Sequence, residues 1–307
     1  MLPFKLVYHP AYDLNLGDHV FPAQKYRLIH DRLLAAGDAE AGDFVAPEPA
    51  NDADILRVHE SGWIHRLQTG AFHPGELLRL EIPYSPEMVN GVWLATGGTI
   101  LAARNTLRDR IGFNIGGGFH HAFSAHGEGF CAINDIAVAI RALQNENLID
   151  RALIVDCDVH HGNGTAAIFA HDPSVFTVSL HQLNNYPNRK PPSTIDIDLQ
   201  DGVGDDEYLT ILKSALARAM IFAPQILIYV AGADPYQEDI LGGLALTMEG
   251  LKRRDRVVLE TALTAGVPVA VVLAGGCARN VSDTVAIHCN TVRAAREALM
   301  PESKEAG

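Results

Sequence analysis

Carboxylates and a histidine alternate with other residues in the segment from Asp156 to His160, and this spacing could bind a metal. In an extended chain alternate side chains share a face, so Asp156, Asp158 and His160 would point the same way. An isolated Asp-x-His pair is more often part of an ion-pair network or a helix N-cap. No Lys or Arg lies nearby in the sequence to neutralise these carboxylates. The segment therefore favours a bound cation.

Asp234 is the natural third ligand, because its motif AGAD follows a second apolar segment that ends at Ala231. On its own, Asp234 would be interpreted as a turn residue. With Asp158 and His160 it supplies one nitrogen and two oxygens, which suit zinc with an open position for water, although Mn(II) and Fe(II) also accept such ligands. Zinc lowers the pKa of bound water toward ~7, so the predicted nucleophile is water.

Two adjacent histidines, His120 and His121, follow three glycines and Phe119. An isolated histidine pair is commonly just exposed at the surface. Because consecutive side chains diverge, both imidazoles can reach one pocket only from an irregular loop, which the glycines permit. Histidine moves protons near neutral pH, so one of the two could take a proton from water and return it to a leaving amine.

Two other catalytic interpretations have weaker support. Ser124, His126 and Cys131 could form a nucleophile and base, but the chain lacks a Gly-x-Ser-x-Gly motif, and Cys131 in FCAIND is predicted to be a small buried apolar residue. The glycines at 116–118 resemble a phosphate loop only faintly, because no Gly-Lys-Ser/Thr follows and no full GxGxxG is present.

These polar residues follow short apolar segments that read as strands, and longer helical patterns separate the segments. The predicted strands are 5–8, 112–115, 152–156, 175–180, 226–231 and 269–273, and the predicted helices are 22–36, 89–106, 134–144, 207–223, 247–264 and 282–299. Asn134 and Ser282 are predicted N-caps. This alternation predicts an α/β fold with a parallel sheet between helices. Since ligands bind at the carboxyl ends of such strands, the segments IGGGFHH, VDCDVHHGNG, VSLH, VAGAD and LAGG are expected to converge on one site.

Length and composition favour a single domain over residues 1–307, because no linker, repeat or low-complexity segment interrupts the even spacing of apolar runs. The net charge of -13 leaves no basic stripe for phosphates, which argues against nucleic-acid binding and is compatible with a cationic substrate. The chain begins without a signal-peptide pattern and has no membrane-spanning run, so a cytoplasmic protein without membrane contact is expected. Its four cysteines are widely spaced, without a CxxC pair, and predict reduced thiols.

Six motifs in a fixed order resemble the histone deacetylase family: GGGFHHA, GEGFCAINDIAVAI, DCDVHHGNGT, VFTVSLH, GADPYQEDILGG and LAGG. The segments VFPAQKYRLIHDRLL and RVHESGWIHRL are similar to the class IV branch and its bacterial relatives, and the likeness spans residues 5–299. It implies the three-layer arginase-deacetylase fold, with a mostly parallel sheet flanked by helices. It also implies a deacetylase-like catalytic domain that hydrolyses an N-acyl group from a lysine-like amine.

The resemblance assigns roles by motif position. Asp158, His160 and Asp234 correspond to zinc ligands, and His121 corresponds to the general base and acid beside His120, which Asp156 would support. Phe130 and Tyr186 would wall an acyl-lysine channel in which the Gly129 carbonyl accepts from the substrate amide. Structural potassium would lie among the carbonyl and carboxylate of Asp156, the carbonyls of Asp158, His160 and Leu180, and the hydroxyl of Ser179. A second monovalent cation would contact the backbone at Phe169, Asp172 and Val175.

The chain departs from the family pattern at two positions. Asn163 stands where several members have Asp behind the second histidine, a change that class II and class IV relatives share. Cys277 stands where the family has the tyrosine of a GGY motif, whose hydroxyl would donate to the developing oxyanion. A thiol is a weak donor on a short stem. Loss of one such donor typically lowers the rate by ~10²–10³.

Several functions remain compatible with Cys277: an attenuated lysine deacylase, a deacylase that accepts a different acyl group, or an acyl-lysine binding module with residual turnover. A small-molecule amidohydrolase of the acetylpolyamine type is a further alternative, favoured if a loop or a dimer narrows the channel. The expected partners are therefore an acylated protein or peptide, or a small acylated amine, and an oligomer is possible. An arginase-like dimetal site would need additional Asp and His ligands, and their spacing is not evident.

Overall fold

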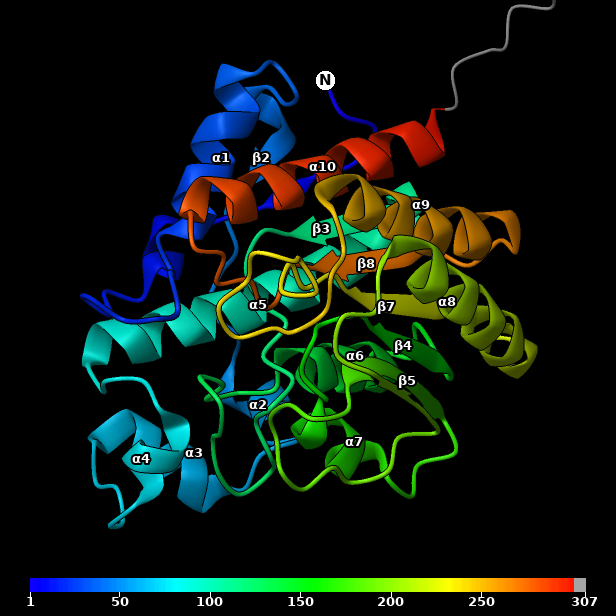
Figure 1. Ribbon diagram of the computed structural model, residues 1–307. Helices are drawn as coiled ribbons and strands as arrows, with labels where there is room; N and C mark the ends of the chain where they lie inside the picture. The colour runs from blue at the N-terminus through cyan, green and yellow to red at the C-terminus, as the bar shows by residue number, and fades with distance from the viewer. Residues whose placement is uncertain (301–307) are drawn as a thin grey trace, which may run out of the picture.

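Eight strands form one sheet at the centre of the molecule, and every pair of neighbouring strands is parallel (Figure 1). The computed structural model describes residues 1–300. The strand order across the sheet is β2-β1-β3-β8-β7-β4-β5-β6. The strands are β1 Leu6–Val7, β2 Phe44–Val45, β3 Ile111–Asn114, β4 Ala152–Asp156, β5 Val175–Gln182, β6 Ile195–Leu199, β7 Ile226–Val230 and β8 Val269–Val272.

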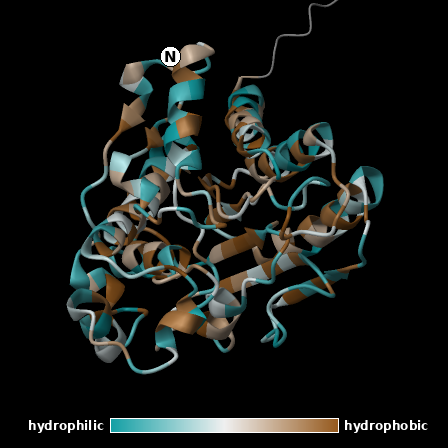
Figure 2. Cartoon of the chain, turned by 60° about the vertical axis from the view of Figure 1, so that its left-hand side comes forward, coloured by the Kyte–Doolittle hydropathy of each residue, from teal (hydrophilic) through white to brown (hydrophobic). Residues whose placement is uncertain are grey.

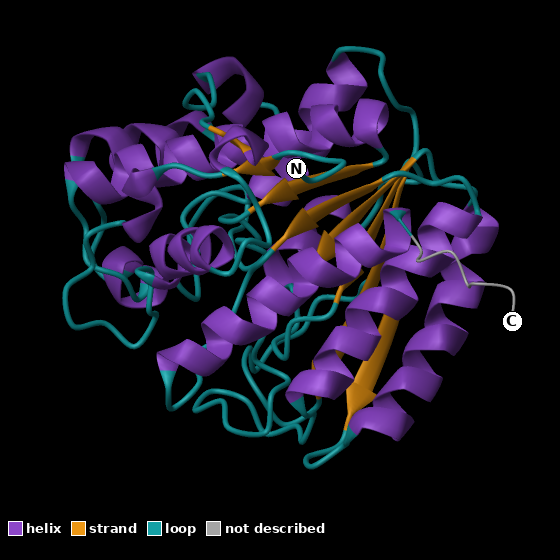
Figure 3. Cartoon of the chain, turned by 90° about the horizontal axis from the view of Figure 1, so that it is seen from above, coloured by secondary structure: helices purple, strands orange, loops and turns teal. Residues whose placement is uncertain are grey.

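Helices cover both faces of this sheet, so the molecule has three layers (Figure 3). On one face α1, α10, α9 and α8 pack in succession, and on the other α5 packs on α6 and α6 on α7. The helices are α1 Lys25–Ala35, α2 Asp52–Ile55, α3 Ser61–Thr69, α4 Glu76–Leu80, α5 Pro86–Asp109, α6 Asp135–Asn145, α7 Asn163–Phe169, α8 Asp205–Ala219, α9 Met248–Thr264 and α10 Val281–Leu299. The fold confirms the predicted α/β class.

The central strands are buried along their whole length, because helices exclude water from both sides of the sheet. This explains why their sequences are continuous apolar runs such as ILIYV in β7. Figure 2 shows these hydrophobic strands inside, with hydrophilic residues on the outer surfaces of the helices. No helix within residues 1–300 is long and apolar enough to span a membrane.

The strand register brings the chain segments of interest to one edge of the sheet. Asp156 at the end of β4 pairs with Val230 at the end of β7, which pairs with Val272 at the end of β8. Val272 in turn pairs with Asn114, the last residue of β3. The loops that follow these four strands therefore leave the sheet side by side.

Two short strands and several short helices escaped prediction from the sequence. β2 has only two residues, and β6 is an edge strand in which aspartates alternate with apolar residues. The prediction of Ser282 as an N-cap is wrong, because α10 begins at Val281 and the side chain of Asn280 accepts from the backbone N–H of Ser282. Asn134 does cap α6, since its side chain accepts from the backbone N–H of Ala137.

Candidate active site

One pocket lies at the edge of the sheet where β3, β4, β7 and β8 end. Its lining includes Gly117, Gly118, Phe119, His120, His121, Gly129, Phe130, Asp158, His160, Tyr186, Asp234 and Cys277. Four of the five segments expected to converge here do so. The VSLH segment does not line the pocket, because β5 continues through Gln182 and His181 pairs with Asp198 inside the sheet.

Asp158, His160 and Asp234 each offer one metal-ligating atom, and these three atoms lie within 4.8 Å of one another. Nδ1 of His160 is 3.1 Å from Oδ1 of Asp158 and 3.5 Å from Oδ2 of Asp234. The expected extended segment is not what aligns them, since β4 ends at Asp156. A turn does so instead, in which the carboxylate of Asp156 accepts from the N–H of Asp158 and that of Asp158 accepts from the N–H of His160.

The two carboxylates of this cluster are fixed from neighbouring loops. Oδ1 of Asp234 accepts from the backbone N–H of Val159 at 2.8 Å, and Oδ2 of Asp158 accepts from that of Gly275 at 2.9 Å. Gly232 and Gly275 face the same carboxylates so closely that a Cβ at either position would lie within 3.0 Å of a carboxylate oxygen. The surrounding backbone therefore holds both acids in place and leaves no room for another side chain.

The charges of the cluster fit a divalent cation. Within residues 1–300, no Lys or Arg approaches Asp158 or Asp234 within 4.0 Å. Burial and the charge of Asp158 raise the pKa of Asp234 to about 7. Burial lowers the pKa of His160, but its hydrogen bonds with the two carboxylates outweigh burial and raise that pKa to about 10. The cluster thus attracts a proton in the position where a metal would supply positive charge. One nitrogen and two oxygens are suitable ligands for zinc.

Lys25, which the sequence did not indicate, lies behind this cluster. Its ammonium group is fully buried and donates to the backbone carbonyl of Ala274 at 2.6 Å. Burial lowers the pKa of Lys25, while the nearby acidic groups, Asp234 and Asp158 among them, raise it. The absence of basic residues near Asp158 in the sequence therefore did not exclude a more distant one in space.

The two adjacent histidines have different partners. Nδ1 of His120 lies 2.7 Å from Oδ2 of Asp156, and Nδ1 of His121 lies 2.7 Å from Oδ1 of Asn163. Burial lowers the pKa of His120, but Asp156 and Asp158 outweigh burial and raise it to about 9. Burial and the neighbouring imidazoles hold the pKa of His121 well below its usual value. Since Asn163 accepts the Nδ1 proton, Nε2 of neutral His121 carries no proton, and it lies 3.1 Å from Nε2 of His120.

Glu128 connects this histidine to the pocket wall. Its Oε1 atom accepts from the amide nitrogen of Asn163 at 2.7 Å and from the hydroxyl of Tyr186 at 2.9 Å. Because the amide nitrogen of Asn163 donates to Glu128, the amide oxygen of Asn163 faces His121. This orientation agrees with a His121 imidazole that carries its proton on Nδ1. Sequence reasoning missed Glu128, because a glutamate in a loop carries no signal that it will meet residues 35 and 58 positions away.

Gly129, Phe130 and Tyr186 form the wall of the pocket. The ring of Tyr186 lies edge-on to that of His121, with centroids 5.0 Å apart. A Cβ at Gly129 would lie 2.8 Å from His121 and 2.9 Å from Tyr186, and its φ of +52° also favours glycine. Close packing around Gly129 therefore keeps the wall narrow beside the histidines.

A model of the histone deacetylase domain matches residues 19–292. The chain belongs to the histone deacetylase family. It is 42% identical over 296 residues to an uncharacterized protein of Picosynechococcus, covering 96% of this chain and 99% of that protein. It is 30% identical to histone deacetylase 2 of Arabidopsis thaliana, covering 91% of this chain and 77% of the relative. The crystal structure of the HDA15 HD domain superposes with a TM-score of 0.78 and 25% identity over 95% of this chain and 87% of that one.

Membership in the histone deacetylase family confirms the resemblance seen in the sequence, and the superposition confirms the arginase-deacetylase type of fold. Family membership also indicates, in general terms, that the chain is a deacetylase, which is a hydrolase that acts on amides.

Cys277, where the family pattern has tyrosine, lines the pocket and is itself buried. Its backbone N–H donates to Oδ2 of Asp239 at 2.6 Å, so the loop is held by a carboxylate that sequence reasoning missed. Burial raises the pKa of the Cys277 thiol to about 12, which keeps it protonated at neutral pH. Tyr26 also lines this pocket, and its buried hydroxyl has no hydrogen-bond partner among residues 1–300.

Of the residues that the family pattern places around the first potassium, Asp156 also contacts His120 of the active site. Oδ1 of Asp156 accepts from the backbone N–H of Asp158, and the hydroxyl of Ser179 lies 2.9 Å from Nδ1 of His181. At the second expected position, the carbonyl of Phe169 accepts from the N–H of Asp172, whose own carbonyl accepts from Val175. Both potassium sites therefore stay predictions.

Proposed function

We propose that this member of the histone deacetylase family is a zinc-dependent hydrolase of N-acyl-lysine. The observation that supports it best is the meeting of Asp158, His160 and Asp234 within 4.8 Å, in the pocket that also holds the histidine pair. These three residues would hold the zinc. When bound, zinc would polarise the scissile carbonyl and lower the pKa of water.

The histidine pair would move the protons of the reaction. His121 is neutral and its Nε2 atom, 3.1 Å from Nε2 of His120, carries no proton, so His121 would take a proton from the attacking water and deliver it to the leaving lysine amine. Asn163 holds Nδ1 of His121 and thereby fixes which nitrogen reacts. His120, paired with Asp156, would keep a positive charge beside the developing negative charge.

The wall of the pocket suits an acylated lysine side chain. Phe130 and Tyr186 would pack against its apolar stem, and the carbonyl of Gly129 would accept from its amide N–H. The lining is largely apolar apart from the site residues already described and from Glu81 and Asn185. A narrow apolar channel that ends at polar groups is typical of a pocket that recognises a long side chain by its tip.

Cys277 would alter rate, acyl preference or both. A thiol reaches less far than a phenol, so the acyl oxygen would lose a donor, at a typical cost of ~10²–10³ in rate. The smaller side chain also leaves space beside the zinc ligands. We propose that a more electrophilic or better-anchored acyl group is hydrolysed faster than acetyl.

The test compares wild type, Cys277→Tyr and Cys277→Phe on acetyl-, trifluoroacetyl- and long-acyl-lysine peptides and on an acetylpolyamine. Phenylalanine is the matched control, because it fills the same space without the hydroxyl. We expect Cys277→Tyr to exceed Cys277→Phe on acetyl-lysine by ~10²–10³ in kcat. Equal rates for the two variants on every substrate would contradict the proposed role of the missing hydroxyl.

The same panel separates the alternative functions. Metal-dependent binding of acyl-lysine peptides without turnover of any acyl group would favour a binding module, for which Cys277 is the structural reason. Turnover of the acetylpolyamine alone would favour a small-molecule amidohydrolase.

A further inference from the structure

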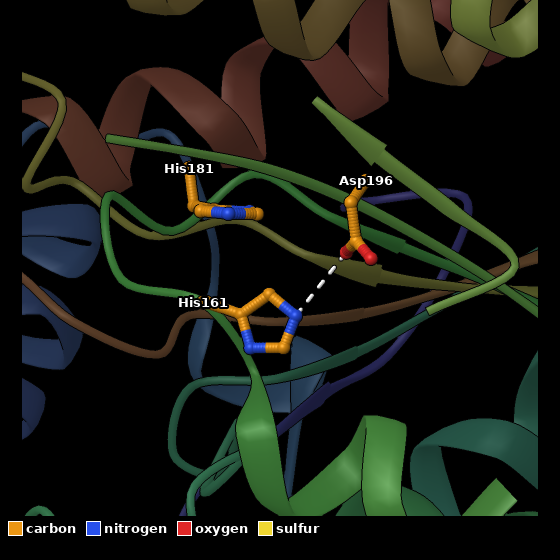
Figure 4. A group of neighbouring side chains, drawn as sticks. All are labelled: His161, His181 and Asp196. Atoms are coloured by element: carbon orange, nitrogen blue, oxygen red, sulfur yellow. Dashed lines mark hydrogen bonds and ion pairs between the residues drawn. The ribbon is translucent and has the colours of Figure 1, made fainter. Parts of the chain in front are cut away.

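A second group of side chains that could hold a metal consists of His161, His181 and Asp196 (Figure 4). His161, His181 and Asp196 each offer one ligand atom, and these atoms lie within 4.8 Å of one another. Nε2 of His161 is 3.1 Å from Oδ1 of Asp196. The two imidazole rings are nearly perpendicular, with centroids 4.6 Å apart.

The sheet itself assembles this cluster. In the pairing of β5 with β6, Ser179 lies opposite Asp196 and His181 lies opposite Asp198. Since alternate residues of a strand share a face, all four side chains point to the same side of the sheet. His161 reaches them from the turn after β4. Three separate segments therefore meet at one point outside the active site.

Burial and charge at this point favour a cation. The side chains of His161 and His181 are 0% and 1% exposed, whereas that of Asp196 is 29% exposed and keeps the cluster open to solvent. Within the described part of the chain, Asp196 and Asp198 have only histidines as ionic partners within 4.0 Å. The ammonium group of Lys190 donates to three backbone carbonyls rather than to these acids.

Hydrogen bonds from outside the cluster orient two of its members, His181 and Asp196, as is usual around metal ligands. The hydroxyl of Ser179 lies 2.9 Å from Nδ1 of His181, which leaves Nε2 turned toward the carboxylates. Oδ2 of Asp196 accepts from the backbone N–H of Ser193 at 2.8 Å, which leaves Oδ1 for His161 or a metal.

We propose that His161, His181 and Asp196 form a second binding site for a divalent transition metal such as zinc, separate from the active site. Two imidazole nitrogens and one carboxylate oxygen are ligands that zinc accepts in tetrahedral sites. A water molecule fills the fourth position, because Asp198, whose Oδ1 lies 3.0 Å from Nε2 of His181, is not within reach of all three ligands. Because His161 adjoins His160, this metal ties the edge strand β6 to the turn of the active site.

The test counts bound zinc. Metal-free protein is incubated with zinc, dialysed and analysed for metal, first as wild type and then as Asp158→Asn/Asp234→Asn, which removes the proposed active-site ligands. We expect two equivalents in wild type and one in the double variant. Adding Asp196→Asn or His181→Gln to the double variant removes the remaining equivalent. Adding Asp206→Asn, which alters a carboxylate that is 90% exposed and paired with Arg253, leaves it bound.

The outcomes distinguish this site from the active site. If the double variant binds no zinc, or if Asp196→Asn and His181→Gln do not reduce binding, the second site does not exist and the histidines only hydrogen-bond to their carboxylates. If only the active-site proposal fails, wild type binds one equivalent that Asp196→Asn removes. Circular dichroism verifies the fold of each variant. For variants that do not fold, zinc-edge diffraction from wild-type crystals decides, and the lack of a peak among His161, His181 and Asp196 overturns the proposal.

Discussion

Gly275 packs against both carboxylates of the proposed zinc site, so replacing it by alanine tests whether that site needs this space. A Cβ at Gly275 would lie 1.9 Å from Oδ2 of Asp234 and 2.5 Å from Oδ2 of Asp158, although real Cβ contacts essentially never fall below 3.0 Å. The Asp234 contact must therefore lengthen by more than 1 Å. Metal–ligand distances tolerate only about ±0.2 Å, so Gly275→Ala displaces at least one ligand from coordination range.

We expect Gly275→Ala to weaken zinc binding by more than the ~10–100-fold that is typical of disturbing an outer-shell partner. The affinity is measured by competition with a chromophoric zinc chelator, and acyl-lysine turnover is measured alongside. Gly42→Ala is the matched control, because a Cβ at Gly42 meets nothing within 4 Å and its φ is not in the left-handed region. The control should keep the affinity and the rate of wild type.

Wild-type zinc affinity in a correctly folded Gly275→Ala protein would refute this reasoning. It would mean either that the carboxylates are free to move or that the metal does not lie between them. Circular dichroism and thermal denaturation exclude the trivial case in which the variant does not fold.

Three further changes test other parts of the site and its support. His121→Ala should lower kcat by ~10²–10⁴ without changing zinc content, and a variant with wild-type turnover would contradict its role as general base. Asp239→Asn removes a charged acceptor from the backbone N–H of Cys277 and should cost about 1–3 kcal/mol in urea denaturation; an unchanged free energy of unfolding would show that this bond does not hold the loop. Burial lowers the pKa of His59 from 6.5 to about 4, and its Nε2 accepts from the N–H of Asn134. The unfolded chain then binds a proton between pH 6.5 and 4 that the folded chain does not, so stability falls as pH drops through this window, by up to roughly 3 kcal/mol. His59→Gln keeps an acceptor but cannot titrate, so its stability should fall less than that of wild type over the same range; an identical pH profile would show that His59 does not titrate as described.

The elements that carry strong periodic or apolar patterns were predictable from the sequence. β4 was predicted with its observed bounds, Ala152–Asp156, because it is an uninterrupted apolar run between a turn and a carboxylate. β6 was missed, because five residues in which Asp alternates with Ile or Leu are too short a pattern to predict a strand at the sheet edge. The two-residue strand β2 is held by pairing with β1, a long-range contact that local sequence does not encode.

The site was predictable where its residues sit close together in motifs. Asp158 and His160 are two positions apart, and the strand register explains why Asp234 meets them. Glu128 and Lys25 were not predictable, because each has an ordinary residue type and reaches the site through loops or a helix far away in sequence. Sequence patterns thus identify the candidate ligands more readily than the residues that orient them.

The proposed zinc centre is tested most directly by diffraction from zinc-loaded crystals on both sides of the zinc absorption edge. We predict an anomalous peak at about 2.0–2.1 Å from a nitrogen of His160 and about 2.0–2.2 Å from a carboxylate oxygen each of Asp158 and Asp234. A zinc-loaded crystal with no anomalous peak in contact with these three residues would contradict the proposed metal centre and, with it, the proposed hydrolytic mechanism.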